Sequence, residues 1–178
     1  CDYRAMQPEL RTKHLVLRRF QREDASEVQK LAGNFNVAKM TLNIPFPYED
    51  GMAEEWISTH EENWNTKKSV IYAILKTGTN KLLGAVGLVE IDGLEGELGY
   101  WIGEPYWGKG YCTEAAKKLI EFSFQKLSLE KIVAEHLTKN PASGRVMKKI
   151  GMQYVKTTQK IDRNGNTSSM EVYEIKNT

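Results

Sequence analysis

Apolar and polar residues alternate along much of the chain in a way that predicts a β-sheet. Strand-like alternation or short apolar runs cover residues 14–20, 70–75, 82–91 and 98–102. Turn residues at 78–80 and 93–96 separate the last three strands, which therefore form a meander. Between the first strand and this meander, apolar residues at helical spacing predict helices over 23–31 and 49–65.

The rest of the chain alternates between helices and strands. A strongly amphipathic pattern predicts a helix over 113–127, and a strand over 131–137 follows it. The next helix, 141–150, begins at Asn140 and is closed by Gly151. Strands over 154–161 and 170–175 complete a hairpin. A meander followed by β-α-β predicts one mixed sheet with helices on both faces.

Composition excludes several classes of protein. The 178 residues are 40% hydrophobic and 27% charged, which fits a single domain spanning the chain. A net charge of +2 argues against nucleic acid as the main partner, and no apolar run is long enough to cross a membrane. Cys1 and Cys112 form neither a disulfide framework nor a metal-ligand spacing, so we expect a cytoplasmic protein. Met6 resembles a natural start, and residues 1–5 are interpreted as a remnant before it.

Residues 107–115, W-G-K-G-Y-C-T-E-A, follow a strand and open a helix. Glycines let the backbone turn tightly and approach a ligand closely. The unpaired amides of the first helical turn, together with the helix dipole, favour an anion such as phosphate. The segment has neither the Lys-Ser/Thr ending of the nucleotide P-loop nor the three-glycine dinucleotide pattern. Taken alone, it is equally consistent with a glycine-rich turn that binds nothing.

A second motif, N-P-A-S-G-R-V-M-K-K-I-G-M at 140–152, begins the helix one strand later. A capped helix with Val146 and Ile150 in the core explains Asn140 and Pro141, but not why Ser143 and Arg145 also match a family pattern. Together with E-L-G-Y-W-I at 97–102 and the loop at 106–115, it resembles the GNAT acetyltransferase superfamily and its RimJ/RimL-like group. The resemblance extends from about residue 10 to 175. It implies a mostly antiparallel mixed sheet of about seven strands, in which 98–102 splays from 131–137.

The resemblance also implies that acetyl-CoA is the co-substrate, without a metal. The pantetheine arm would lie in the splayed gap, and backbone amides at 108–113 would bind the pyrophosphate. Pro105 stands where many relatives carry Gln or Arg, which leaves one cationic phosphate contact fewer. The residues assigned to the coenzyme on this basis are Tyr100, Trp101, Ile102, Gly108, Lys109, Gly110, Tyr111, Cys112, Thr113, Asn140, Ser143 and Arg145.

Amine acetylation needs a base, because a protonated amine cannot attack a thioester. Glu97 matches the acidic position before Gly-Tyr in the family strand, although it is also readable as an exposed strand carboxylate. Nearby alternatives are Glu90, Glu95 and Glu104. Ser143 is the candidate proton donor to the leaving thiolate. A backbone N–H of the splayed strand is the candidate donor to the oxyanion.

Two other residue types invite competing interpretations. Cys112 at a helix N-terminus is a possible nucleophile, but no histidine lies close in sequence and packing is favoured. His136 lies inside an apolar strand and is interpreted as a core residue. Trp56, Trp64 and Phe35 lie in the region that forms the acceptor side in relatives, and none is assigned to substrate.

Three functions are compatible with these motifs. The first is acetyl transfer to a protein N-terminal α-amine by direct attack in a ternary complex. The second is transfer to a small amine such as a polyamine, an amino sugar or an antibiotic, which the acidic run at 49–62 slightly favours. The third is a non-catalytic acyl-CoA-binding regulatory module, against which the presence of Glu97 and Ser143 argues. The predicted partners are acetyl-CoA and an amine, with no nucleic acid or membrane, and a homodimer is left open.

Overall fold

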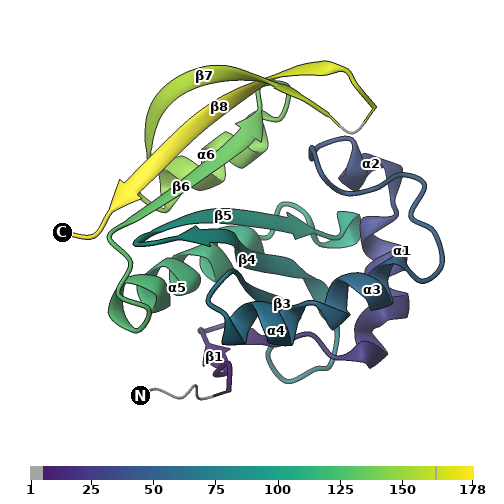
Figure 1. The fold of residues 1–178 in the computed structure, drawn as a ribbon. Coiled ribbons are helices and arrows are strands. Elements are labelled where there is room, and N and C mark those ends of the chain that lie inside the picture. Colours follow the sequence, from purple (N-terminus) through teal and green to yellow (C-terminus); the bar gives the residue numbers. More distant parts are fainter. Residues whose placement is uncertain (1–5, 163) are drawn as a thin grey trace.

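The computed structural model describes residues 6–162 and 164–178, and the predicted remnant at 1–5 lies outside these described residues. Eight strands form one sheet in the order β1-β2-β3-β4-β5-β6-β8-β7 (Figure 1). They are β1 (Leu10–Arg11), β2 (Leu15–Arg18), β3 (Val70–Lys76), β4 (Leu82–Asp92), β5 (Glu95–Ile102), β6 (Lys131–Leu137), β7 (Gln153–Ile161) and β8 (Thr167–Lys176). The sequence predicts about seven strands, one fewer than the structure has, because the two residues of β1 are too few to produce a periodic pattern.

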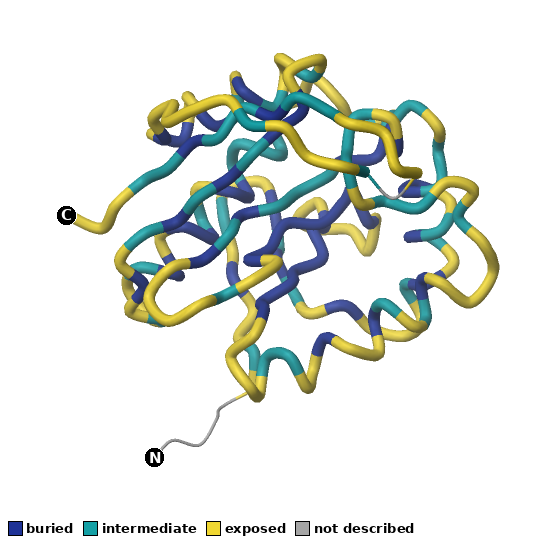
Figure 2. Tube along the Cα trace, turned by 45° about the horizontal axis from the view of Figure 1, so that its top comes forward, coloured by how far each residue is buried: buried dark blue, intermediate teal, exposed yellow. Residues whose placement is uncertain are grey.

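Helices cover both faces of the sheet, as the element order predicts. They are α1 (Ala25–Ala32), α2 (Phe35–Ala38), α3 (Met52–Ser58), α4 (His60–Asn65), α5 (Tyr111–Gln125) and α6 (Pro141–Lys149). Side chains alternate across β3, so Tyr72 and Ile74 join the core beneath α5 and α6, while Ile71 and Ala73 join the core beneath α1 and α3. Figure 2 shows buried positions along the middle strands and exposed ones along the loops. None of the described helices is long and apolar enough to cross a membrane.

Two helices differ from the predicted pattern. The helix expected over 49–65 is interrupted at Thr59, whose backbone N–H and hydroxyl both donate to the Trp56 carbonyl, replacing the i→i−4 bond. The short α2 has no periodic signal. It is started by Asn34, whose side chain accepts hydrogen bonds from the amides of Asn36 and Val37.

The central strands β5 and β6 run parallel and separate after four residues. Glu95–Leu98 pairs with Lys131–Ala134, but β5 then continues to Ile102 against β4 while β6 continues to Leu137 against β8. The separation begins opposite an extra residue, Val89, in the β4–β5 ladder. A bulge increases the local twist and bends the bulged strand, here β4, and β5 stays paired with β4 beyond this point while its pairing with β6 ends. The predicted splayed pair is therefore confirmed (Figure 1).

His60 is buried in an aromatic cluster on the α1–α4 side of the sheet. Its ring meets Trp56 edge to face at 4.5 Å and lies 5.6 Å from Phe20. The residue is 7% exposed, and neither ring nitrogen has a hydrogen-bond partner among the described residues. Burial lowers the pKa of His60 from 6.5 to about 4, because the charged imidazolium cannot be solvated there.

We therefore predict an acid-dependent loss of stability that His60→Phe removes. The His60 imidazole binds a proton near pH 6.5 in the unfolded chain but only near pH 4 in the folded protein. His60 therefore contributes stability above pH 6.5 that is lost as pH falls toward 4, by about 3 kcal/mol in total. Urea unfolding of both proteins at pH 7 and pH 4.5 measures this difference. Parallel pH dependences in the two proteins would show that His60 titrates normally.

Candidate active site

The gap between β5 and β6 exposes two strand edges inside the molecule. In the described part of the chain, residues 99–102 have no strand partner on the β6 side, and residues 135–137 have none on the β5 side. Backbone N–H and C=O groups in a protein interior need hydrogen-bond partners. These two edges are therefore suited to bind an extended polar chain.

The two faces of β5 present different chemistry to this gap. Leu98, Tyr100 and Ile102 contribute to the core beneath α5 and α6, whereas Glu97, Gly99 and Trp101 point to the opposite face. Gly99 has a steric reason to be glycine. An added Cβ would lie 2.8 Å from a Val89 methyl group on the bulge of β4.

Tyr100 and Ser143 form a hydroxyl pair across the gap. Their side-chain oxygens lie 2.9 Å apart, and the Tyr100 hydroxyl also lies 3.1 Å from the Ser143 carbonyl oxygen. Burial raises the pKa of Tyr100 far above its usual 10, so its hydroxyl stays protonated at neutral pH. Sequence analysis places both residues at the coenzyme but does not indicate that they touch, because 43 residues separate them.

Helix α6 sits close against β6 because Gly144 has no side chain. A Cβ there would lie 2.7 Å from the Nε2 of His136. The His136 Nδ1 donates to the Leu137 carbonyl oxygen at 2.7 Å, while Nε2 has no partner among the described residues. His136 is therefore a buried core residue, as predicted.

Helix α6 starts after Asn140, as predicted, but the Asn140 side chain does not cap it. Asn140 occupies the N-cap position of α6 but makes no capping hydrogen bond. Its side-chain amide instead donates to the Met40 carbonyl oxygen at 3.2 Å, across 100 residues of sequence. A long-range contact has replaced the local one, and it joins the loop after α2 to the start of α6.

The glycine loop has the backbone shape that an anion site needs. Gly108 and Gly110 have φ angles of +76° and +79°, and an added Cβ on either would meet no atom within 4 Å. The first backbone bond of α5 runs from the Glu114 N–H to the Gly110 carbonyl, which leaves the amides at 111–113 without intrahelical partners. The Trp107 indole donates to the Ile102 carbonyl at 2.7 Å and anchors the loop to the end of β5. The basic residues Lys109 and Arg145 are both exposed.

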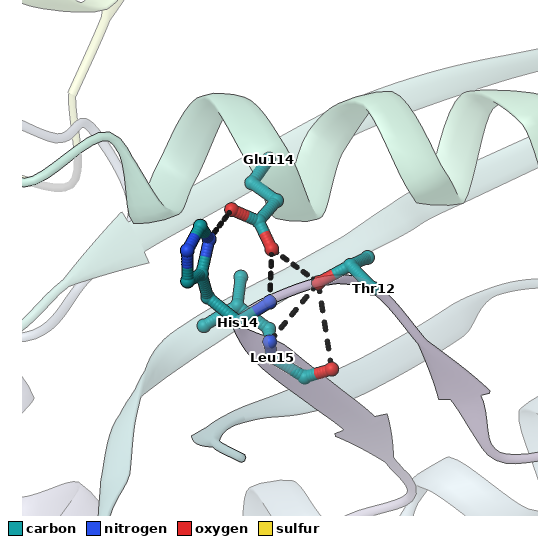
Figure 3. Close-up of polar contacts among 4 residues, drawn as sticks. All are labelled: Thr12, His14, Leu15 and Glu114. Carbon is teal, nitrogen blue, oxygen red and sulfur yellow. Dashed lines mark hydrogen bonds and ion pairs between the residues drawn. The ribbon is translucent and has the colours of Figure 1, made fainter.

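Glu114 ties the start of α5 to the turn between β1 and β2 (Figure 3). One of its carboxylate oxygens accepts hydrogen bonds from the Thr12 hydroxyl and, at 2.8 Å, from the His14 backbone N–H. The other oxygen lies 2.9 Å from the His14 Nδ1. Burial alone would raise the pKa of Glu114, but these hydrogen bonds outweigh it and lower that pKa. The contacts hold the carboxylate against the β1–β2 turn.

The Cys112 thiol does not have the properties of a nucleophile. The residue keeps some exposed surface, but its side chain packs against the core beneath α5. Burial raises the pKa of the Cys112 thiol well above its usual value, so the thiolate is not formed at neutral pH. The packing interpretation therefore accounts for this side chain.

Glu97 is half-buried on the face of β5 that points away from α5 and α6, and charged groups surround it. Glu90 lies opposite it on β4, and Glu135 stands two residues beyond its β6 partner Val133 on the same face. Burial raises the pKa of Glu97, Glu135 and then Glu90 raise it further, and Lys160 opposes them. A carboxylate with a raised pKa is suited to accept a proton near neutral pH.

The alternatives to Glu97 named from sequence have other partners or positions. Glu104 accepts hydrogen bonds from the side-chain amides of Asn34 and Asn36 at 2.8 and 2.9 Å, which fixes the start of α2. Glu95 pairs with Lys131 at 3.2 Å at the far end of β5. Glu90 is exposed beside Glu97.

A pocket of about 190 Å³ lies between the segment around α2 and the turn of the β7–β8 hairpin. Phe35 and Phe46, whose rings meet edge to face at 5.2 Å, line one side, and Leu137 at the end of β6 lines another. Leu137 shares a face with Glu135, so the pocket and the carboxylates lie on the same face of β6. Trp56 packs against Phe20 and His60 instead, and Trp64 packs against the core. Among the described residues, no cluster of three or more His, Cys, Asp or Glu side chains has the arrangement of a metal site.

The sequence of this chain is similar to those of known acetyltransferases. Residues 14–153 match a family described as the acetyltransferase (GNAT) domain. The chain is 29% identical over 146 residues to a Bacillus licheniformis protein named N-acetyltransferase p20, covering 81% of this chain and 82% of p20. It is 30% identical over 143 residues to the N-acetyltransferase YnaD of Bacillus subtilis strain 168, covering 80% of this chain and 81% of YnaD.

Solved structures share the fold at lower sequence identity. The microcin C7 self-immunity acetyltransferase MccE, in complex with acetyl-CoA and AMP, has a TM-score of 0.84 at 22% identity over 93% of this chain and 94% of its own. RimL, a ribosomal L7/L12 α-N-protein acetyltransferase in complex with coenzyme A, has 0.82 at 15% over 93% and 95%. A Vibrio cholerae spermidine N-acetyltransferase, in complex with coenzyme A and spermine, has 0.78 at 21% over 93% and 96%.

The contacts of Glu114 lead to a prediction about α5. Glu114→Ala removes a charged acceptor of three hydrogen bonds and is expected to lower the free energy of unfolding by about 1.5–3 kcal/mol, with weaker binding of coenzyme A. Urea unfolding and calorimetric titration with coenzyme A measure both effects. Glu121→Ala is the matched control, because it removes a more exposed carboxylate, paired with Lys118 on the same helix, and is expected to cost less than about 1 kcal/mol. Equal losses in the two variants would contradict a positioning role for Glu114.

Proposed function

Since this chain belongs to the GNAT family of acetyltransferases, we propose that it acetylates the N-terminal α-amine of a protein by direct attack with both substrates bound. The chain is an N-acetyltransferase that uses acetyl-CoA, which supplies an acyl group activated as a thioester. The observation that carries the mechanism is the position of the gap. Glu97 lies on one face of it and the Tyr100–Ser143 hydroxyl pair on the other.

The residues present fit the coenzyme. The open edge at 99–102 offers backbone groups to the pantetheine chain, as the two amide groups of that chain require. The amides at 111–113 and the left-handed glycines Gly108 and Gly110 offer an open anion site to the pyrophosphate. Asn140, whose amide bonds to Met40, is held at the side of the gap. Lys109 and Arg145 are exposed, and we propose that they add positive charge near the phosphates.

Glu97 is proposed to accept the proton that the acceptor ammonium must lose before attack. The backbone amides of the open β5 edge then donate to the oxyanion that attack on the carbonyl produces. Collapse of the tetrahedral intermediate re-forms the carbonyl and breaks the C–S bond, and the Ser143 hydroxyl donates a hydrogen bond to the departing thiolate. The second proton that the attacking nitrogen loses then neutralises that thiolate, so Ser143 keeps its own proton overall. Tyr100, which stays protonated, shares a hydrogen bond with Ser143 and supports that donation.

Three considerations support a protein N-terminus as the acceptor. RimL, whose name describes acetylation of a ribosomal protein α-amine, shares the fold along 93% of this chain. The pocket at the end of β6 combines apolar side chains such as Phe35 and Phe46 with polar ones such as Asp162, a mixed surface suited to the residues that follow the terminal amine. An α-amine also titrates near pKa 8, so it loses its proton more readily than a lysine amine.

A polycationic small amine is the second candidate, and one observation favours it. Three carboxylates, Glu90, Glu97 and Glu135, lie on the same face of the gap with one lysine among them. A negative site attracts cations and concentrates them. The Vibrio cholerae relative of the same fold is named a spermidine N-acetyltransferase.

Intact-mass spectrometry separates the two acceptors. The protein is incubated with acetyl-CoA and a panel of peptides with Ser or Ala N-termini, polyamines, amino acids and aminoglycosides. We expect a gain of one acetyl group on the peptides, and α-N-blocked peptides containing lysine serve as the control. A gain on the polyamines alone would replace the proposed acceptor with the second candidate.

We predict that Glu97→Gln lowers kcat/KM near neutral pH by about 100-fold or more. In the native enzyme the carboxylate must be ionised, so activity falls as pH drops through its raised pKa. The variant has lost that group, and its acidic limb at this pKa should disappear. The control is Glu95→Gln, on the same strand and face but paired with Lys131. A native profile for Glu97→Gln would transfer the role of base to another carboxylate or to water.

A further inference from the structure

Lys160 is the cation that faces the carboxylates around Glu97, and it comes from a distant part of the chain. It lies near the tip of the β7–β8 hairpin, opposite Ser168, and its Nζ contacts the Glu135 carboxylate on β6. Strand β7 is an exposed edge strand, and the Lys160 side chain is itself 44% exposed. The hairpin thus brings one long side chain back over β8 to the acidic face of the gap.

The pairing of the strands places these groups on one face. Glu97 is opposite Glu90 on β4 and opposite Val133 on β6, and Glu135 follows Val133 by two residues. Side chains two apart on a strand share a face, so Glu135 stands beside Glu97 where the strands begin to separate. The charged groups facing Glu97 are therefore Glu90 from β4, Glu135 from β6 and Lys160 from β7.

The charge balance depends on that single lysine. Three carboxylates without a cation would repel one another, and the half-buried Glu97 would hold its proton most strongly because burial already disfavours its charge. The bond to Glu135 raises the pKa of Lys160, as do the charges of Glu135, Glu97 and Glu90, so the lysine is charged at neutral pH.

We propose that Lys160 is a positioning residue that holds Glu135 beside Glu97 and supplies the positive charge that keeps Glu97 ionised at neutral pH. The inference deepens the proposed function, because it rests on Glu97 as the base. It gives the β7–β8 hairpin a part in the chemistry, although no residue of the hairpin belongs to either sequence motif.

The test compares three variants of the full chain. Lys160→Met removes the charge, Lys160→Arg keeps it, and Lys156→Met removes a lysine from the same exposed strand and face four residues away. The carbon-13 signal of the Glu97 carboxyl group, assigned by its loss in Glu97→Gln, is titrated in each protein. We expect Lys160→Met to raise the pKa of Glu97 by about one pH unit, and the other two variants to leave it near the native value. An equal titration in Lys160→Met and Lys156→Met would overturn the proposal.

The pH dependence of kcat/KM provides the second readout. We expect the acidic limb to move to higher pH in Lys160→Met, by the same amount as the carboxyl titration, and to be restored by Lys160→Arg. If the carboxyl titration shifts but the rate profile does not, the coupling of Lys160 to Glu97 is supported and the role of Glu97 as base is overturned. If Glu97→Gln abolishes the acidic limb while Lys160→Met leaves that limb at its native pH, Glu97 is supported as the base and the role of Lys160 is overturned.

Discussion

The need of buried backbone groups for hydrogen-bond partners is the constraint on which the site depends. In a parallel pair of strands, the backbone groups of the two facing edges normally hydrogen-bond to each other. Strands β5 and β6 pair in this way only where Glu95–Leu98 faces Lys131–Ala134. Beyond those residues the two strand edges face each other across a gap, and the described strands form no ladder across it. The sheet therefore carries an incomplete hydrogen-bond ladder at its centre, and a chain-like ligand with amide groups would complete it. Acetyl-CoA has such a chain.

The elements around the gap are held in place by contacts between distant segments. Glu114 fastens the start of α5 to the β1–β2 turn, and Asn140 fastens the start of α6 to the loop after α2. Glu104 fastens α2 to the end of β5. Each contact uses a polar side chain at the end of a helix, where free backbone groups and ligand-binding geometry occur together. The rigid frame leaves the amides at 111–113 and the β5 edge available for the coenzyme.

Charge is distributed unequally across the two faces of β5. Tyr100, in a buried environment with Ser143, remains neutral and is suited to donate a hydrogen bond. Glu97, on the other face, is half-buried among Glu90, Glu135 and Lys160, and its proton affinity is raised. Opposite environments on alternating residues of a single strand separate the proposed proton acceptor from the proposed proton donor. In the proposed mechanism, the thioester and the amine meet between them.

The sequence by itself determined the order of the elements, the two glycine-containing motifs and the family. Helical and strand periodicities are local, and turn and cap residues such as Gly110 and Gly151 act through their own backbone. Tertiary structure alone decided the rest: the interruption at Thr59, the contact of Asn140 with Met40, the Tyr100–Ser143 pair and the approach of Lys160 to Glu135. Strand pairing and long side chains join residues dozens of positions apart, and no local pattern records which face or partner they meet.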